Sequence, residues 1–190
     1  MVRLYILKED LYLEVRGMVH EPMPALDESS SDWREIYFFR NSVGTLLEIR
    51  SAIETLRREK SFIRALSGQP PPLNRAFDDL TKALNRADSL IKKLRNEVAG
   101  HLPDKAFAEA LDKIGSDTRG LLQMGNSAKE IHYKFSPEFL GATMLRHVAY
   151  QDVEKEWQKM CKTTLRLSFQ AIRAIDTLFV AYSRIHDLSF

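Results

Sequence analysis

Residues 77–98 read FDDLTKALNRADSLIKKLRNEV and contain the most regular hydrophobic pattern of the chain. Apolar side chains recur in steps of three and four, at Phe77, Leu80, Leu84, Ala87, Ile91, Leu94 and Val98. This period places them on one face of an α-helix and is typical of a bundle seam. The pattern predicts one helix from about Leu73 to Ala99. Its seam exceeds what one short partner helix would cover, which favours a homodimer.

Two further helices are predicted before this seam. Residues 3–20 carry apolar side chains on one helical face, and a strand is the weaker alternative because Leu11 and Leu13 also alternate. Asp32 and Glu35 have the spacing of a capping box, which predicts that the second helix begins there.

The second helix is expected to continue to about Leu66 on the stripe that begins with Ile36 and Phe39. The three prolines at 70–72 then end it, because proline removes a backbone donor and fixes φ. We interpret this tract as a semi-rigid turn between antiparallel helices, and a proline-rich ligand for another domain as the alternative.

After the seam, residues 103–114 predict a short helix and residues 151–185 a long last one. Residues 116–149 are less helical and predict a small irregular or β-hairpin insertion. The fold class expected is all-α, an antiparallel bundle of four main helices plus a short one. A chain of 190 residues is expected to form one domain, 1–190.

Composition limits the classes of function. The net charge is only +2, so nucleic-acid contact requires a local basic patch. The single Cys161 excludes an intrachain disulfide, which fits a cytoplasmic location. The five histidines lie in separate segments without metal-ligand spacing, so neither a metal nor a cofactor is expected. The sequence contains no uninterrupted run of about 20 apolar residues, so no membrane span is predicted.

The seam leads directly into Arg95 and Asn96, and His101 follows six residues after the arginine. On an uninterrupted helix Arg95 and His101 would point about 120° apart. Gly100 can adopt the left-handed conformation that ends helices, so we expect His101 on a tight corner that turns back toward Arg95. A surface arginine and a corner histidine that caps helix carbonyls are the alternative interpretation.

These three side chains suit RNA cleavage without a metal. The imidazole of His101 can accept or donate a proton near neutral pH. The guanidinium of Arg95 is permanently charged and matches two phosphate oxygens at once. Asn96 can orient the phosphate or ribose by hydrogen bonds. Lys92 and Lys93, immediately before the motif, are candidate nucleic-acid-binding residues.

This motif resembles the signature of the HEPN superfamily, which lies at a helix–helix corner. In that signature four to six residues separate an arginine from a histidine, and a polar residue usually follows the arginine directly. The resemblance implies an HEPN-like bundle and a metal-independent endoribonuclease, often a toxin of a toxin–antitoxin or defence system. It also implies a homodimer in which two copies of the Arg95–His101 motif line one cleft, with a protein antitoxin or regulatory partner. Pro103 stands where some members carry a modifiable tyrosine, which puts that mode of control in doubt. The alternative is a non-catalytic helical binding or dimerisation module on the same fold.

Overall fold

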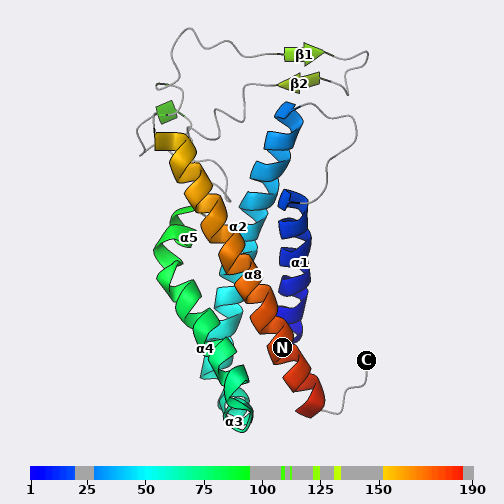
Figure 1. Ribbon diagram of the computed structural model, residues 1–190, viewed down its shortest axis with the longest axis vertical. Helices are drawn as coiled ribbons and strands as arrows, with labels where there is room; N and C mark the ends of the chain where they lie inside the picture. The colour runs from blue at the N-terminus through cyan, green and yellow to red at the C-terminus, as the bar shows by residue number, and fades with distance from the viewer. Residues whose placement is uncertain are drawn as a thin grey trace.

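The computed structural model describes residues 1–19, 28–94, 108–109, 112, 122–124, 131–133 and 152–185, and these are predominantly helical (Figure 1). The described residues include six helices: α1 (Val2–Val19), α2 (Glu28–Arg58), α3 (Lys60–Ser67), α4 (Pro71–Arg86), α5 (Asp88–Leu94) and α8 (Val153–Ile185). The all-α expectation is therefore confirmed. None of the described helices is long and apolar enough to cross a membrane.

The four longest helices pack side by side as a bundle. α1 lies against α2 and α8, and α4 lies against α8 on the other side (Figure 1). Successive long helices run in opposite directions, as the short connections predicted. α3 lies at one end of the bundle, between the end of α2 and the start of α4.

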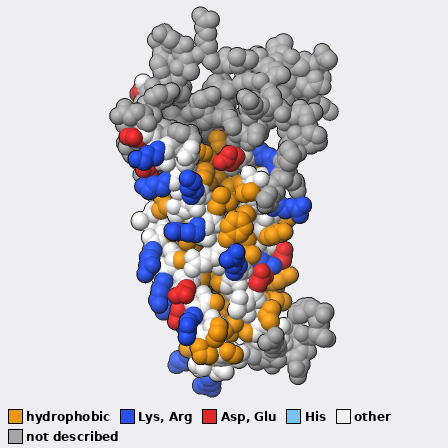
Figure 2. Space-filling view, in the orientation of Figure 1, with side chains coloured by type: hydrophobic (Ala, Val, Ile, Leu, Met, Phe, Trp, Pro, Cys, Tyr) orange, Lys and Arg blue, Asp and Glu red, His pale blue; other side chains and the backbone are white. Residues whose placement is uncertain are grey.

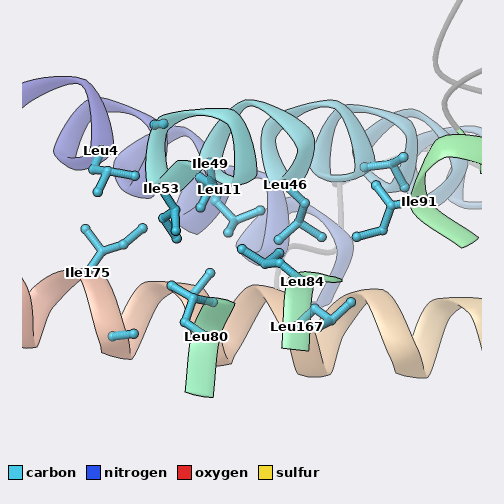
Figure 3. Close-up of a cluster of buried hydrophobic side chains, with 14 of the residues drawn as sticks. Leu4, Leu11, Leu46, Ile49, Ile53, Leu80, Leu84, Ile91, Leu167 and Ile175 are labelled. Carbon is cyan, nitrogen blue, oxygen red and sulfur yellow. The ribbon is translucent and has the colours of Figure 1, made fainter. Parts of the chain in front are cut away.

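The core of the bundle is built from leucine, isoleucine and phenylalanine side chains of α1, α2, α4, α5 and α8. Figure 3 shows these side chains directed toward one another from the surrounding helices. Those almost completely removed from solvent include Leu11, Phe39, Leu46, Ile49, Phe77, Leu80, Leu84 and Ile175. The seam residues Phe77, Leu80, Leu84, Ile91 and Leu94 are thus buried within one chain, so this part of the seam does not require a second copy.

The predicted single helix from Leu73 to Ala99 is wrong in its continuity. α4 ends at Arg86, Ala87 is a turn residue with φ −87° and ψ −1°, and α5 begins at Asp88. The amide of Ala87 still donates to the carbonyl of Ala83 at 3.1 Å, and the amide of Ile91 donates to the carbonyl of Ala87 at 2.8 Å, so bonds of helical spacing continue across the break. Leu84 and Ile91 remain buried on either side of it, which preserves the hydrophobic pattern.

The second predicted helix is wrong at both ends. α2 begins at Glu28, so Asp32 lies inside the helix and the predicted capping box is absent. α2 ends at Arg58 because Glu59 adopts an extended conformation, with φ −79° and ψ 106°. The break turns α3 onto α4, where the ring of Phe62 packs 5.3 Å from that of Phe77. The proline tract lies at the start of α4, which begins at Pro71, two residues before the predicted Leu73, so only Pro70 of the three prolines lies in the turn.

The remaining predictions concern the first and last helices, the 116–149 region and the short helix at 103–114. α1 and α8 confirm the predicted first and last helices within two residues, and α1 excludes the strand alternative. Two three-residue strands, β1 (Leu122–Met124) and β2 (Ile131–Tyr133), pair antiparallel inside the region expected to be irregular or to form a hairpin. Most of the predicted 103–114 helix lies outside the described residues.

Candidate nucleic-acid interface

The predicted catalytic residues Arg95, Asn96 and His101 lie outside the described residues, as does Gly100. The description of this segment ends at Leu94, the residue directly before the motif. Leu94 is 2% exposed and belongs to the hydrophobic core. The chain therefore enters the motif from a point that is anchored in the bundle.

Lys92 is exposed on α5 and forms an ion pair one helical turn back. Its Nζ lies 2.9 Å from Oδ2 of Asp88, whose other oxygen accepts from Nη1 of Arg50 on α2. Arg50 also lies 3.0 Å from Glu54. An exposed pair between residues four apart contributes little, so a phosphate can compete for Lys92. The side chain of Lys93 lies outside the described part of the chain.

Other cations suggested by the sequence lie on α4 and around α3. Arg75, Lys82 and Arg86 are exposed on α4, but the exposed Asp78 and Asp79 alternate with them. A second exposed group surrounds the break between α2 and α3 and comprises Arg57, Arg58, Lys60 and Arg64. Neither group forms a continuous basic surface along one helix.

A basic feature of the described surface that was not predicted lies on α8. Five exposed cations recur on this helix: Lys155, Lys159, Lys162, Arg166 and Arg173. Their spacing is three or four residues, except that Phe169 occupies the position between the last two. We call these five residues the basic stripe. At 100° per residue they occupy one side of the helix, over about 27 Å of its length. Of the five residues of the basic stripe, only Lys159 forms an ion pair with another described residue, Glu156, at 3.2 Å.

The basic stripe borders a groove between α4 and α8. α4 contributes Ala76 and Asp79, and α8 contributes Arg166, Phe169, Gln170 and Arg173 among others. The groove has a volume of about 500 Å³ and is open to solvent. Figure 2 shows Lys and Arg side chains gathered on the side of this face where α4 and α8 lie, next to apolar side chains.

A titratable group that sequence reasoning also missed lies between α1 and α2. Oγ1 of Thr45 donates to Oε1 of Glu14 at 2.8 Å. Burial raises the pKa of Glu14 to about 7, and the negative charge of Asp10 acts in the same direction. The hydroxyl groups of Thr45 and Ser42 lower this pKa by less than burial raises it.

Metal-ligating side chains do not cluster within the described ranges, where no group of three or more histidine, cysteine, aspartate or glutamate residues occurs. The half-buried Cys161 approaches Glu35, with its Sγ 3.8 Å from Oε1. The chemistry that the described surface offers is therefore the attraction of anions by the basic stripe and the groove beside it. No family model, no curated protein and no solved structure matches this chain.

Proposed function

We propose that the protein binds RNA and cleaves it as a metal-independent endoribonuclease. The observation that carries the binding part is the basic stripe, which gathers five exposed cations on one helix of a chain whose net charge is +2. Four of the five have no ion-pair partner among the described residues, so their charges are available to phosphates. Phosphate neutralisation supplies most of the affinity of nucleic-acid binding that is independent of sequence.

The cleavage part rests on the resemblance to HEPN ribonucleases. His101 would transfer protons, Arg95 would stabilise the charge on the phosphorane, and Asn96 would position the substrate. One histidine cannot easily serve as both base and acid in one step, so the reaction would use a composite cleft from two chains. A toxin role with a protein antitoxin belongs to the same proposal.

A non-catalytic RNA-binding module is the second candidate. The basic stripe supports it equally well, because phosphate attraction does not depend on His101. The two candidates share their binding surface and differ only in whether bound RNA is cut, so separate measurements of binding and cleavage distinguish them.

The binding proposal predicts a strong dependence on salt. Affinity for a labelled single-stranded RNA, measured by fluorescence anisotropy, should fall with a log–log slope of about −3.5 if all five cations contact phosphates. The double variant Lys162→Glu, Arg166→Glu should weaken binding at least tenfold in 0.1 M salt. The matched control is Lys60→Glu, Arg64→Glu, which makes the same charge change near α3. An equal loss in both variants would refute a localised interface.

The cleavage proposal predicts that RNA is cut in EDTA and that the products carry 2′,3′-cyclic phosphate ends. His101→Ala should reduce the rate by about 10²–10⁴-fold while binding persists, because proton transfer contributes about that factor. Arg95→Lys should not restore a normal rate, since a point charge cannot reproduce the bidentate fork. Binding without cleavage by the wild-type protein would favour the non-catalytic module.

A further inference from the structure

Phe169 places an exposed aromatic ring on the same side of α8 as the basic stripe. It lies three residues after Arg166 and four before Arg173, and it is 46% exposed. Among the described residues, no other aromatic ring stacks on it. Removing a phenylalanine side chain from water lowers the free energy. The exposed ring between two cations therefore offers a face on which a planar partner can stack.

The two arginines beside this ring are suited to phosphate groups. They lie seven residues apart, which separates them by about 10 Å along the helix axis. Neither forms an ion pair with a described residue. A guanidinium fork can bind two phosphate oxygens at once. One ring between two such forks matches a repeating chain in which each flat base lies between two phosphates.

Asp79 on the α4 side of the groove gives the bound chain an orientation. Its exposed carboxylate repels phosphate, and among the described residues it forms no ion pair with either arginine. The phosphates must then face α8, and the edge of the base must face α4. A carboxylate accepts hydrogen bonds from an exocyclic amino group, which cytosine carries where uracil has a carbonyl oxygen.

We propose that the α4–α8 groove is a nucleobase-binding subsite for one nucleotide of a single-stranded nucleic acid. Phe169 stacks on the base, Arg166 and Arg173 bind the flanking phosphates, and Asp79 accepts a hydrogen bond from the base edge. The subsite rests on the proposed RNA binding, because the basic stripe supplies the attraction that holds the strand. A duplex does not fit this role, since its bases already stack on one another.

The test compares the full-length wild-type protein with Phe169→Ala, using a labelled 2′-O-methyl cytidine octamer in an anisotropy titration. This probe lacks the 2′-hydroxyl that metal-independent cleavage requires, so it survives in either functional class. Phe169→Ala should weaken binding by about 5- to 100-fold, the range for loss of one stacked base. Phe169→Tyr should restore the affinity to within about twofold, because tyrosine keeps an aromatic face.

Two controls separate stacking from general damage. Val180→Ala shortens another exposed apolar side chain of α8, which is 49% exposed, and should leave the affinity unchanged. A 2′-O-methyl duplex of equal length should bind wild type and Phe169→Ala alike. Unequal duplex binding or a loss in Val180→Ala would overturn the stacking role.

The orientation has its own readout. Wild type should bind the cytidine octamer more tightly than the uridine octamer, and Asp79→Asn should abolish most of the difference. The two probes have the same ring size and charge and differ only at position 4 and N3, so the comparison reports the hydrogen bonding of the base edge. A wild-type protein without this preference would overturn the role of Asp79.

Failure of the subsite and failure of the proposed function give different results. Salt-dependent binding of the octamer that Phe169→Ala leaves intact would overturn the subsite alone. No binding of any oligonucleotide by wild type would overturn both. Binding to phosphatidylserine vesicles in place of oligonucleotides would assign the basic stripe to an anionic membrane surface.

Discussion

Glu14 carries a half-buried carboxyl group at the contact between α1 and α2. Burial raises its pKa to about 7 from an ordinary value of 4.5, so the folded protein holds this proton more tightly than the unfolded chain. Stability therefore falls as the pH rises from about 4.5 to about 7, because folding then requires either proton uptake or a buried charge.

Glu14→Gln should make the protein more stable at pH 8 and remove the part of the pH dependence that Glu14 causes. The amide keeps the shape of the protonated acid, and one pKa unit corresponds to about 1.4 kcal/mol. We expect a gain on the order of 1 kcal/mol or more at pH 8 and almost none at pH 4, measured by urea unfolding. Glu48→Gln on the exposed side of α2 is the control. A gain of equal size at both pH values would exclude titration of Glu14 as the cause.

Individual site residues were only partly accessible to sequence reasoning. The sequence pointed to Lys92 because it lies close to Arg95. Its ion pair with Asp88 joins residues four apart on helix α5, so it follows from local helical structure. The contact of Asp88 with Arg50 joins residues 38 positions apart, and no local pattern predicts it. The basic stripe does leave a signal in the sequence, because its cations recur at helical spacing, but the apolar pattern of the same helix does not reveal it.

The backbone of α1 at Gly17 lies against the ring of Phe38 on α2. A Cβ atom built there would lie 2.5 Å from Cε2 of Phe38, closer than real contacts allow. Gly44 is the opposite case, because a Cβ atom there would meet nothing within 4 Å. Both glycines lie inside helices, so the same substitution tests packing at one and backbone propensity at the other.

Gly17→Ala should destabilise the protein by about 1–3 kcal/mol, since the Phe38 ring must move to admit the methyl group. Gly44→Ala should stabilise it by about 0.5–1 kcal/mol, because alanine is the better helix former. Thermal or urea unfolding of both variants provides the comparison. Stabilisation in both would mean that the Phe38 ring yields without cost.

The helices themselves followed from hydrophobic periodicity, whereas their breaks did not. The proline tract predicted the helix break before α4, which lies between Ser67 and Pro71, because proline acts locally. Glu59 and Ala87 interrupt helical patterns without glycine or proline, and alanine favours helices most of all. Their conformations follow from tertiary packing, which turns α3 onto α4 and places Asp88 against Arg50.

The bundle as a whole buries in one chain the seam that first suggested a dimer. Phe77, Leu80 and Leu84 are almost inaccessible without a second copy. The remaining reason for a homodimer is the composite cleft that the HEPN resemblance implies.

Light scattering at micromolar concentration should therefore give twice the chain mass if the composite site exists. A mixture of His101→Ala and Arg95→Ala chains should then recover some activity, since a mixed dimer can retain intact residues from both copies. A monomeric mass together with RNA cleavage would contradict the composite site and leave binding by the basic stripe unaffected.

The basic stripe also has an electrical consequence for the whole molecule. The chain carries a net charge of only +2 and α8 concentrates five cations on one side, so the remaining residues are net acidic. Five like charges along one side of α8 produce a local positive potential, which attracts a polyanion before contact. If the proposed RNA binding holds, this attraction favours encounters in which α8 faces the polyanion and makes the association rate fall with ionic strength.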